Sequence, residues 1–404
     1  MRKFFALIFL AFVLAACGSG SIHVPAEAAI IYEETDTEDA EEVDASAESI
    51  TVIAEPSPLP EPNPEPESEP EHLDPIDEFI SQMSIYEQIG QLFIARMPNM
   101  RYAELLIREH HIGGFILFGS DVSSTDQVQR LTSELQEMSE IPLFIAVDEE
   151  GGRVSRVGRL FPERALAPFA IGSTGDIQLA YQTYYAIGGQ LAYLGFNMNF
   201  APVADIWSNP ANRVIGDRSF GTEPDLVAKM VTAAVEGLHS AGILAVIKHF
   251  PGHGDTVEDS HYHMAFYHHD RVRFNEMEAI PFISGIEAGA EGVMMGHIAT
   301  PLILTETPSL PATFSSYFME QILRQEMGFD GLIITDALDM GALTRYYSPE
   351  EIVLYAFLNG ADILLMPNNP SQAIGFMVDA FKEGRFTEER LHESLRRILR
   401  HKIN

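Results

Sequence analysis

Residues 225–255 read DLVAKMVTAAVEGLHSAGILAVIKHFPGHGD. Asp225 to Ala241 has the apolar spacing of an amphipathic helix, for which Thr222 is a candidate cap. Leu244 to Lys248 is a short, largely apolar run of the kind found in buried strands. Glycine and proline in the residues that follow predict a loop. The segment therefore indicates the alternation of helix and strand that is typical of a parallel α/β sheet.

Eight runs of this strand type follow Pro75, with amphipathic stretches such as Phe274 to Ala288 between them. The runs are Gln91 to Ala95, Gly114 to Phe118, Leu143 to Val147, Asn197 to Pro202, Leu244 to Lys248, Gly292 to Met295, Leu332 to Thr335 and Asp362 to Met366. Eight such units in about 330 residues suit a (β/α)8 TIM-like barrel of the α/β class. We expect residues 76–404 to form this one domain. An open, doubly wound sheet is the alternative on the pattern alone.

The first residues predict export from the cytoplasm. Arg2 and Lys3 precede the apolar run Phe4 to Val13, which is too short to span a bilayer, so residues 1–16 are predicted to be a signal peptide. Leu-Ala-Ala-Cys at residues 14–17 resembles the lipobox of bacterial lipoproteins. Cys17 is the only cysteine in 404 residues and cannot form an internal disulfide. We expect lipid attachment at Cys17 and an extracytoplasmic protein held at the membrane by this anchor alone. The alternative is an ordinary cleaved signal with an incidental cysteine.

The segment between the signal and the barrel has a different composition. Gly18 to Pro75 holds 17 Asp and Glu and no Lys or Arg, with a tract rich in proline and glutamate. Such a composition cannot build a core and favours extended conformations, so residues 17–75 are predicted to be a disordered tether. The chain's formal charge is −34, and its sequence contains no cluster of basic residues. We therefore expect no nucleic-acid partner, and we expect a monomer.

Polar residues follow six of the eight predicted strands. They are Arg96, Asp148, Asp205, Lys248 with His249, His297 and Asp336. In a (β/α)8 barrel the catalytic groups lie just past the carboxyl ends of the strands. A single residue such as His297 is equally well explained as a structural polar group, but six at one end of a barrel predict a site.

The densest cluster of these residues is Lys-His-Phe-Pro-Gly-His-Gly at 248–254, followed by Asp-Ser-His at 259–261. This pattern resembles the signature of bacterial β-N-acetylglucosaminidases of glycoside hydrolase family 3. Four further segments agree with that family, in the family's order along the chain: 147–154, 199–205, 214–221 and 334–340. The chain departs from the usual pattern at Arg213 and at Tyr262 to Ala265.

The resemblance implies a retaining glycoside hydrolase with no metal or other cofactor. It implies that Asp336 is the nucleophile and that Asp259 and His261 form an acid/base dyad. It also implies that the sugar hydroxyls are bound by Asp148, Arg156, Arg218, Lys248 and His249. The expected substrate is a cell-wall glycan or muropeptide with a non-reducing terminal β-linked N-acetylglucosamine.

The chemical requirements of glycoside hydrolysis support these assignments independently of the resemblance. Retaining hydrolysis needs a carboxylate to form the glycosyl-enzyme and a proton donor at the departing oxygen. A carboxylate at a strand end is rigidly placed for the first task. A histidine titrates near neutrality, and a paired carboxylate can fix its tautomer. Asp259 itself is the alternative proton donor.

Other classes of function fit parts of the sequence. A metal site is one alternative, since imidazoles and carboxylates are common ligands; its candidate residues are His249, His253, Asp255, His261, His263, His268 and His269. A second alternative is a non-catalytic wall-binding lipoprotein, against which the intact Asp336, Asp259 and His261 argue. A third is another β-glycosidase, such as a β-glucosidase. Family β-glucosidases commonly have a second α/β domain that contributes to the active site, and we expect none here.

Overall fold

The computed structural model describes residues 74–305 and 310–403. The predicted signal peptide, Cys17 and all but the last two residues of the predicted tether lie outside these ranges. The residues described below therefore belong to the predicted barrel domain and the short segment that leads into it.

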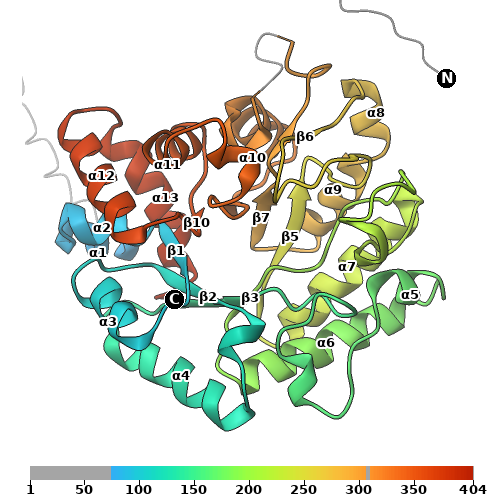
Figure 1. Ribbon diagram of the computed structural model, residues 1–404, viewed down its shortest axis with the longest axis horizontal. Helices are drawn as coiled ribbons and strands as arrows, with labels where there is room; N and C mark the ends of the chain where they lie inside the picture. The colour runs from blue at the N-terminus through green and yellow to red at the C-terminus, as the bar shows by residue number, and fades with distance from the viewer. Residues whose placement is uncertain (1–73, 306–309, 404) are drawn as a thin grey trace, which may run out of the picture. The chain divides into compact units, whose positions relative to one another are not determined.

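Eight parallel strands form one sheet that closes on itself (Figure 1). They are β1 (Phe93–Arg96), β2 (Gly114–Leu117), β3 (Phe144–Val147), β4 (Met198–Asn199), β5 (Leu244–Phe250), β7 (Gly292–Met295), β9 (Leu332–Thr335) and β10 (Leu364–Leu365). Their order is β10-β1-β2-β3-β4-β5-β7-β9. A parallel bridge between Ile334 and Ile363 joins the two ends of the sheet, and the N–H of Thr335 donates to Ile363 O at 3.0 Å. The predicted (β/α)8 barrel is confirmed, and the open sheet is wrong.

Helices surround the strands (Figure 1). They are α1 (Pro75–Gln82), α2 (Ile85–Gly90), α3 (Met100–Arg108), α4 (Thr125–Met138), α5 (Pro168–Gly172), α6 (Ile177–Tyr193), α7 (Pro224–Ser240), α8 (Arg271–Glu276), α9 (Ala279–Glu287), α10 (Gly341–Thr344), α11 (Pro349–Leu358), α12 (Pro370–Lys382) and α13 (Glu388–Arg400), with a π-helix at Tyr317–Glu326. A short separate pair, β6 (Ala265–Phe266) and β8 (Ile298–Ala299), lies beyond the barrel's strands.

All eight predicted strands are present, but two of them, β4 and β10, are only two residues long. In the run Asn197 to Pro202 only β4 is regular strand, because Pro202 has no N–H to donate to a neighbouring strand. The chain nevertheless continues along its neighbours, since the N–H of Phe200 donates to Val147 O at 2.8 Å. The apolar run therefore located the buried segment correctly, while backbone pairing decided how much of it is strand.

Two predictions about helices are wrong. Thr222 does not cap α7, which begins at Pro224 with Glu223 at the N-cap position and no side-chain cap. Proline suits that first position because its missing N–H would have no helical partner there. The stretch Phe274 to Ala288 is two helices, α8 and α9, separated at Met277, whose backbone leaves the helical conformation (φ −130°, ψ −80°).

A buried carboxylate attaches the last helix to the barrel. Asp362, fully buried before β10, accepts from the N–H of Ile333 at 2.9 Å and from Arg324 Nη2 at 2.6 Å. Its other oxygen accepts from Ser394 Oγ at 2.7 Å and Arg397 Nη1 at 3.2 Å, both on α13. A buried charge with this many partners holds β9, β10 and α13 in one arrangement, which places the carboxyl end of β9.

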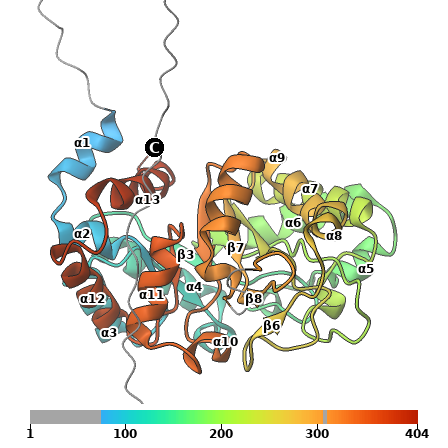
Figure 2. The same ribbon diagram turned by 90° about the horizontal axis from the view of Figure 1, so that it is seen from above.

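The first described helix lies against the last. Arg396 Nε on α13 donates to Asp77 Oδ1 on α1 at 2.7 Å, and the two helices are neighbours in Figure 2. Among the helices of residues 74–305 and 310–403, none has the length and apolarity that crossing a bilayer would require.

Candidate active site

A cleft of about 340 Å³ opens at the carboxyl ends of the barrel strands. Its lining includes five of the polar residues predicted from their places after the strands, namely Arg96, Asp148, Lys248, His249 and Asp336. Arg156, Arg218 and His261 reach it from loops. Asp205 and His297 are buried and do not line the cleft. The structure thus brings seven of the eight residues predicted to act on the sugar into one cavity, and the eighth, Asp259, contacts His261.

Four charged side chains form the base of the cleft. Lys248 Nζ donates to Asp148 Oδ1 at 2.6 Å and lies 2.6 Å from Glu150 Oε1. Arg218 holds the same Glu150 with two parallel bonds of 2.8 Å, from Nε to Oε2 and from Nη2 to Oε1. The side chains of Lys248 and Glu150 are almost completely removed from solvent. The cluster is therefore a buried network in which each cation has a carboxylate partner.

The charges of this network are coupled through the central carboxylate. Burial alone would raise the pKa of Glu150, but the adjacent Arg218 and Lys248 outweigh it and hold the pKa far below its usual range. The pKa of Arg218 is correspondingly raised by Glu150 against its own burial. Glu150 is ionised throughout the neutral range, so both cations stay fixed and charged beside the cleft.

His249 is oriented by a second buried carboxylate. His249 Nδ1 lies 2.7 Å from Asp205 Oδ2, and Asp205 Oδ1 also accepts from the N–H of His253 at 2.6 Å. Burial raises the pKa of Asp205, but the adjacent His249 lowers it by more, so the carboxyl is ionised and can only accept hydrogen bonds. The proton of His249 is therefore on Nδ1, which leaves Nε2 facing the cleft, 3.3 Å from Arg218 Nη2.

Asp336 follows β9 directly. Its backbone N–H donates to Met295 O at 2.9 Å, and its Oδ1 accepts from the N–H of Ala337 at 2.7 Å. Burial raises the pKa of Asp336, but the imidazoles of His249 and His297 more than compensate and bring it below the usual value. At neutral pH this carboxylate is ionised and its second oxygen is not used by a hydrogen bond within the described chain.

His297 supports the backbone beside Asp336. Its Nε2 lies 2.9 Å from Ala337 O, which can only accept, so this nitrogen carries a proton. Its Nδ1 lies 2.7 Å from Thr313 Oγ1. Burial lowers the pKa of His297. These contacts show that His297 is a structural polar residue: it is a buried histidine that fixes the turn after β9.

Asp259 and His261 pair on the loop that follows β5. His261 Nδ1 lies 2.7 Å from Asp259 Oδ1, which also accepts from the backbone N–H of His261 at 3.0 Å. Burial raises the pKa of Asp259, and its bonds to His261 reverse that effect, so the pKa lies below its usual value. An ionised Asp259 fixes the proton of His261 on Nδ1 in the neutral ring. Nε2 is then the nitrogen that can take up and release a proton at the exposed edge of the cleft.

This loop rests directly on the turn that carries Asp336. The N–H of Gly341 donates to His261 O at 2.9 Å, and a Cβ at Gly341 would lie 2.8 Å from that oxygen. The N–H of Ala342 donates to Ser260 O at 3.2 Å. Only glycine allows this close approach, so the backbone itself couples the position of His261 to the segment after β9.

His253 holds the other end of the loop. This buried imidazole lies 2.7 Å from Thr256 Oγ1 through Nδ1 and 3.1 Å from Ser260 Oγ through Nε2. Burial and the nearby His249 lower its pKa to about 4, so it is neutral. Gly254, next to it, approaches the loop after β4 so closely that a Cβ would lie 1.8 Å from Ile206 O. Gly254 of the motif is thus required by this close approach, which leaves no room for a side chain.

Arg156 completes the wall of the cleft next to Asp148. Its Nη2 is 3.9 Å from Asp148 Oδ2, and its guanidinium carbon lies 5.6 Å from the centre of the Phe118 ring. The same ring has Arg96 at 4.9 Å. The arginines are therefore held mainly over an aromatic surface, which leaves their N–H groups available to a ligand.

Sequence reasoning did not predict that Glu150, Asp205 and His253 organise the site through buried contacts. Glu150 had a usable signal, because the alternation of a strand places residues 148 and 150 on the same side. Asp205 was recognised only as a residue after a strand. Four of the histidines proposed as metal ligands bind separate partners: His249 binds Asp205, His253 binds Thr256 and Ser260, His261 binds Asp259, and His269 binds Asp255. Within residues 74–305 and 310–403, no three His, Cys, Asp or Glu side chains converge as a metal site.

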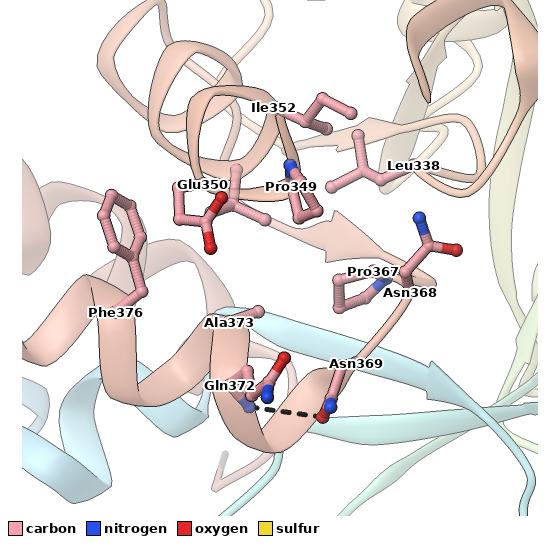
Figure 3. A pocket seen from close by; sticks show the side chains of 11 residues that line it. Leu338, Pro349, Glu350, Ile352, Pro367, Asn368, Asn369, Gln372, Ala373 and Phe376 are labelled. Atoms are coloured by element: carbon pink, nitrogen blue, oxygen red, sulfur yellow. Dashed lines mark hydrogen bonds between the residues drawn. The ribbon is translucent and has the colours of Figure 1, made fainter. Parts of the chain in front are cut away.

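A second pocket of about 110 Å³ lies between the N-terminal ends of α11 and α12 (Figure 3). Leu338 lines it from the turn after β9, and Pro367 and Asn368 line it from the segment after β10. Glu350 is the only ionisable residue in its lining. The pocket offers little chemistry, so the larger cleft is the candidate active site.

The chain is similar to proteins of known family. The profile of the glycosyl hydrolase family 3 N terminal domain matches residues 84–401. A beta-hexosaminidase A from Pseudoalteromonas piscicida is 39% identical over 320 residues, covering 72% of this chain and 53% of that protein. A beta-hexosaminidase from Hydrogenovibrio crunogenus is 36% identical over 271 residues, covering 65% of this chain and 73% of that protein.

The structure of a glycoside hydrolase family 3 beta-N-acetylglucosaminidase from Paenibacillus sp. str. FPU-7 is similar with a TM-score of 0.76. It is 39% identical in sequence, and the match covers 79% of this chain and 62% of that one. The chain thus spans about half the length of the Pseudoalteromonas relative and less than two thirds of the Paenibacillus protein.

The buried network of Glu150, Lys248 and Arg218 is expected to stabilise the fold. Glu150→Gln should lower the free energy of unfolding at pH 7 by about 3 kcal/mol, because it leaves Lys248 and Arg218 buried without their carboxylate. Since the pKa of Glu150 is depressed in the fold, this stabilisation is present above the unfolded pKa of about 4.3 and is lost as the pH falls below it. Urea denaturation between pH 3 and 7 measures both effects.

Glu287→Gln, at an exposed position on α9, is the matched control and should change the free energy by less than about 0.5 kcal/mol. An equal, small effect of both substitutions would contradict the stabilising role of Glu150.

Proposed function

Because the chain belongs to glycosyl hydrolase family 3, we propose that it is a retaining β-N-acetylglucosaminidase that removes non-reducing terminal β-linked N-acetylglucosamine from glycans. The observation that carries the proposal is the geometry of one cleft: an ionised Asp336 lies in it, and the loop bearing His261 is bonded to the turn after Asp336. Both groups that double displacement needs are therefore available at one cavity.

In the proposed mechanism Asp336 attacks the anomeric carbon through its free oxygen while the glycosidic bond breaks. His261 Nε2 gives its proton to the departing oxygen, and the Asp259 carboxylate stabilises the charge on the ring through Nδ1. Water then replaces the leaving group, His261 takes its proton, and the glycosyl bond to Asp336 breaks. Each proton lost by the imidazole is thus recovered in the second step.

The sugar is proposed to be held by the charged wall of the cleft. Asp148 accepts hydrogen bonds from hydroxyls, while Arg156, Arg218 and Lys248 donate to them and His249 offers Nε2. Arg218 and Lys248 are already fixed by Glu150, and His249 by Asp205, so these three groups need little reorganisation when a sugar binds.

The proposal extends to the natural substrate and to location. The substrate is a cell-wall glycan or muropeptide, in which N-acetylglucosamine is linked to N-acetylmuramic acid. Cys17 carries lipid that anchors the protein outside the cytoplasm, and residues 17–75 act as the tether. The sequence pattern at 14–17 and the acidic, proline-rich composition of Gly18 to Pro75 support this part of the proposal.

The substrate class is tested with aryl glycosides. The protein should hydrolyse 4-nitrophenyl β-N-acetylglucosaminide much faster than the β-glucoside, and Asp336→Asn should lose nearly all turnover because the glycosyl-enzyme cannot form. A 2-fluoro sugar with a good leaving group should label Asp336, as read by peptide mass spectrometry. A preference for the glucoside would favour the β-glucosidase alternative, and a label on Asp339 or Asp148 would contradict the assignment of the nucleophile.

The acid/base role is tested by the leaving group. His261→Ala should slow disaccharide cleavage by about 10² to 10⁴-fold, the usual worth of general acid catalysis, but should scarcely slow glycosylation by a 2,4-dinitrophenyl glycoside. Asp259→Asn should show a milder version of the same selectivity, measured by pre-steady-state kinetics. Equal losses on both substrates in His261→Ala, with a selective loss in Asp259→Asn, would assign the proton to Asp259.

The anchor is tested by Cys17→Ser in the natural host. This substitution removes the thiol that would carry lipid, so the protein should be released from membranes or remain unprocessed, as followed by fractionation and immunoblotting. Retention of a processed Cys17→Ser protein in the membrane fraction would reject lipidation.

A further inference from the structure

Glu149 is a buried carboxyl residue that belongs to none of the pairs described above. It is 1% exposed and lies between Asp148 and Glu150, directly after β3. Alternation along an extended chain turns residues 148 and 150 toward the cleft and residue 149 the other way. Its backbone is fixed by Asn199 on β4, which accepts from the N–H of Glu149 at 2.9 Å and donates to its carbonyl at 3.0 Å.

The carboxylate of Glu149 is bound by the backbone of the following loop. Oε2 accepts from the N–H of Arg156 at 2.6 Å and from that of Val157 at 2.8 Å. Gly158 lies so close that a Cβ there would be 3.1 Å from Oε1. Two backbone donors converging on one oxygen make a fixed anion site inside the loop, occupied by the protein's own side chain.

The loop in question presents Arg156 to the cleft. Residues 151–157 contain no helix or strand, and Gly151 and Gly152 begin it with φ values of 89° and 58°. Among the residues that the structure describes, Arg156 has one ion-pair partner, Asp148, at the long distance of 3.9 Å. The bonds from Glu149 to the N–H groups of Arg156 and Val157 therefore fix the loop backbone from which this guanidinium extends over the Phe118 ring.

We propose that Glu149 is a positioning residue: its ionised carboxylate orders the loop that carries Arg156 and so sets the affinity of the cleft for the sugar. The inference rests on the proposed function in one respect, the contact of Arg156 with substrate. It adds a pH dependence of binding that is separate from the proton transfers of His261 and Asp336.

The direction of that dependence follows from the surroundings of Glu149. Burial raises the pKa of its carboxyl, and the hydroxyl of Ser155 and the loop N–H groups offset this only in part. The charged groups of the loop are Arg156 and Arg153, and Arg153 pairs with Asp217 at 2.6 Å. Helix α6 contributes Tyr184, whose pKa is raised well above its usual value and which is therefore neutral. Lys248 and Arg218 pair with the neighbouring Glu150 instead. The carboxyl consequently takes up a proton at a higher pH than an ordinary glutamate, and the loop loosens as the pH falls through that range.

The experiment compares KM and kcat for 4-nitrophenyl β-N-acetylglucosaminide between pH 4.5 and 8 in the parent and in Glu149→Gln. At pH 7.5 the variant should show a KM raised roughly tenfold, the worth of one charge-assisted hydrogen bond, with kcat within about twofold. The KM of the parent should rise toward that of the variant as the pH falls, while that of the variant stays flat. Equal KM values at pH 7.5, or parallel pH profiles, would overturn the proposal.

Two further variants keep the test independent of folding. Arg156→Gln should abolish the same rise of KM at low pH. Adding Glu149→Gln to it should raise KM no further, because both residues act through one contact. Additive effects in the double variant would overturn the inference. Glu87→Gln changes a carboxylate that accepts from the N–H of Ser84 at 2.7 Å in the cap of α2, away from the cleft, and is the matched control with unchanged kinetics. Failure of the parent to cleave the glycoside would instead reject the proposed function.

Discussion

The carboxylate of Glu150 is the group on which the cleft depends. It lies fully buried between Lys248 from β5 and Arg218 from the loop after β4, at distances of 2.6 and 2.8 Å. Two cations brought this close in a protein interior would repel each other and would each be costly to desolvate without it. Because the carboxylate is shared, it holds three segments at this end of the barrel in one rigid arrangement. Asp148, which pairs with the same Lys248, is then placed at the cleft surface with its second oxygen free of any short contact.

A second constraint joins the two halves of the proposed chemistry. The loop after β5 could hold His261 in many positions, since both His261 and Asp259 are exposed. It is fixed at Ser260 and His261 by buried and backbone contacts: His253 binds the Ser260 hydroxyl, and the N–H groups of Gly341 and Ala342 donate to the carbonyls of His261 and Ser260. The segment that offers the proton is thus attached to the segment that offers the carboxylate. Movement of one shifts the other, so their relation is a property of the fold and not of one flexible side chain.

The positions of the strands and of the residues after them could be predicted because they depend on local pattern. Short apolar runs are buried, parallel strands place their carboxyl ends at one edge, and polar residues at that edge are candidates for the site. This reasoning located Asp148, Lys248, His249 and Asp336 in the cleft. The resemblance to the family added Arg156, Arg218 and the Asp259–His261 pair, which residue pattern alone would have left in ordinary loops.

The sequence by itself therefore determined the barrel, the end of the barrel that carries the site, and most of the charged and histidine side chains that line it. Only the tertiary structure decided which of two adjacent glutamates binds Lys248 and which binds the loop of Arg156, and that Asp205 orients His249. It also decided that α8 and α9 are separate helices. The physical reason is that these outcomes depend on partners 7 to 100 residues away, as with Arg156 and Glu149 or Lys248 and Asp148. A local pattern specifies which residues are buried, whereas the pairing of buried charges is settled only when the segments that carry them meet.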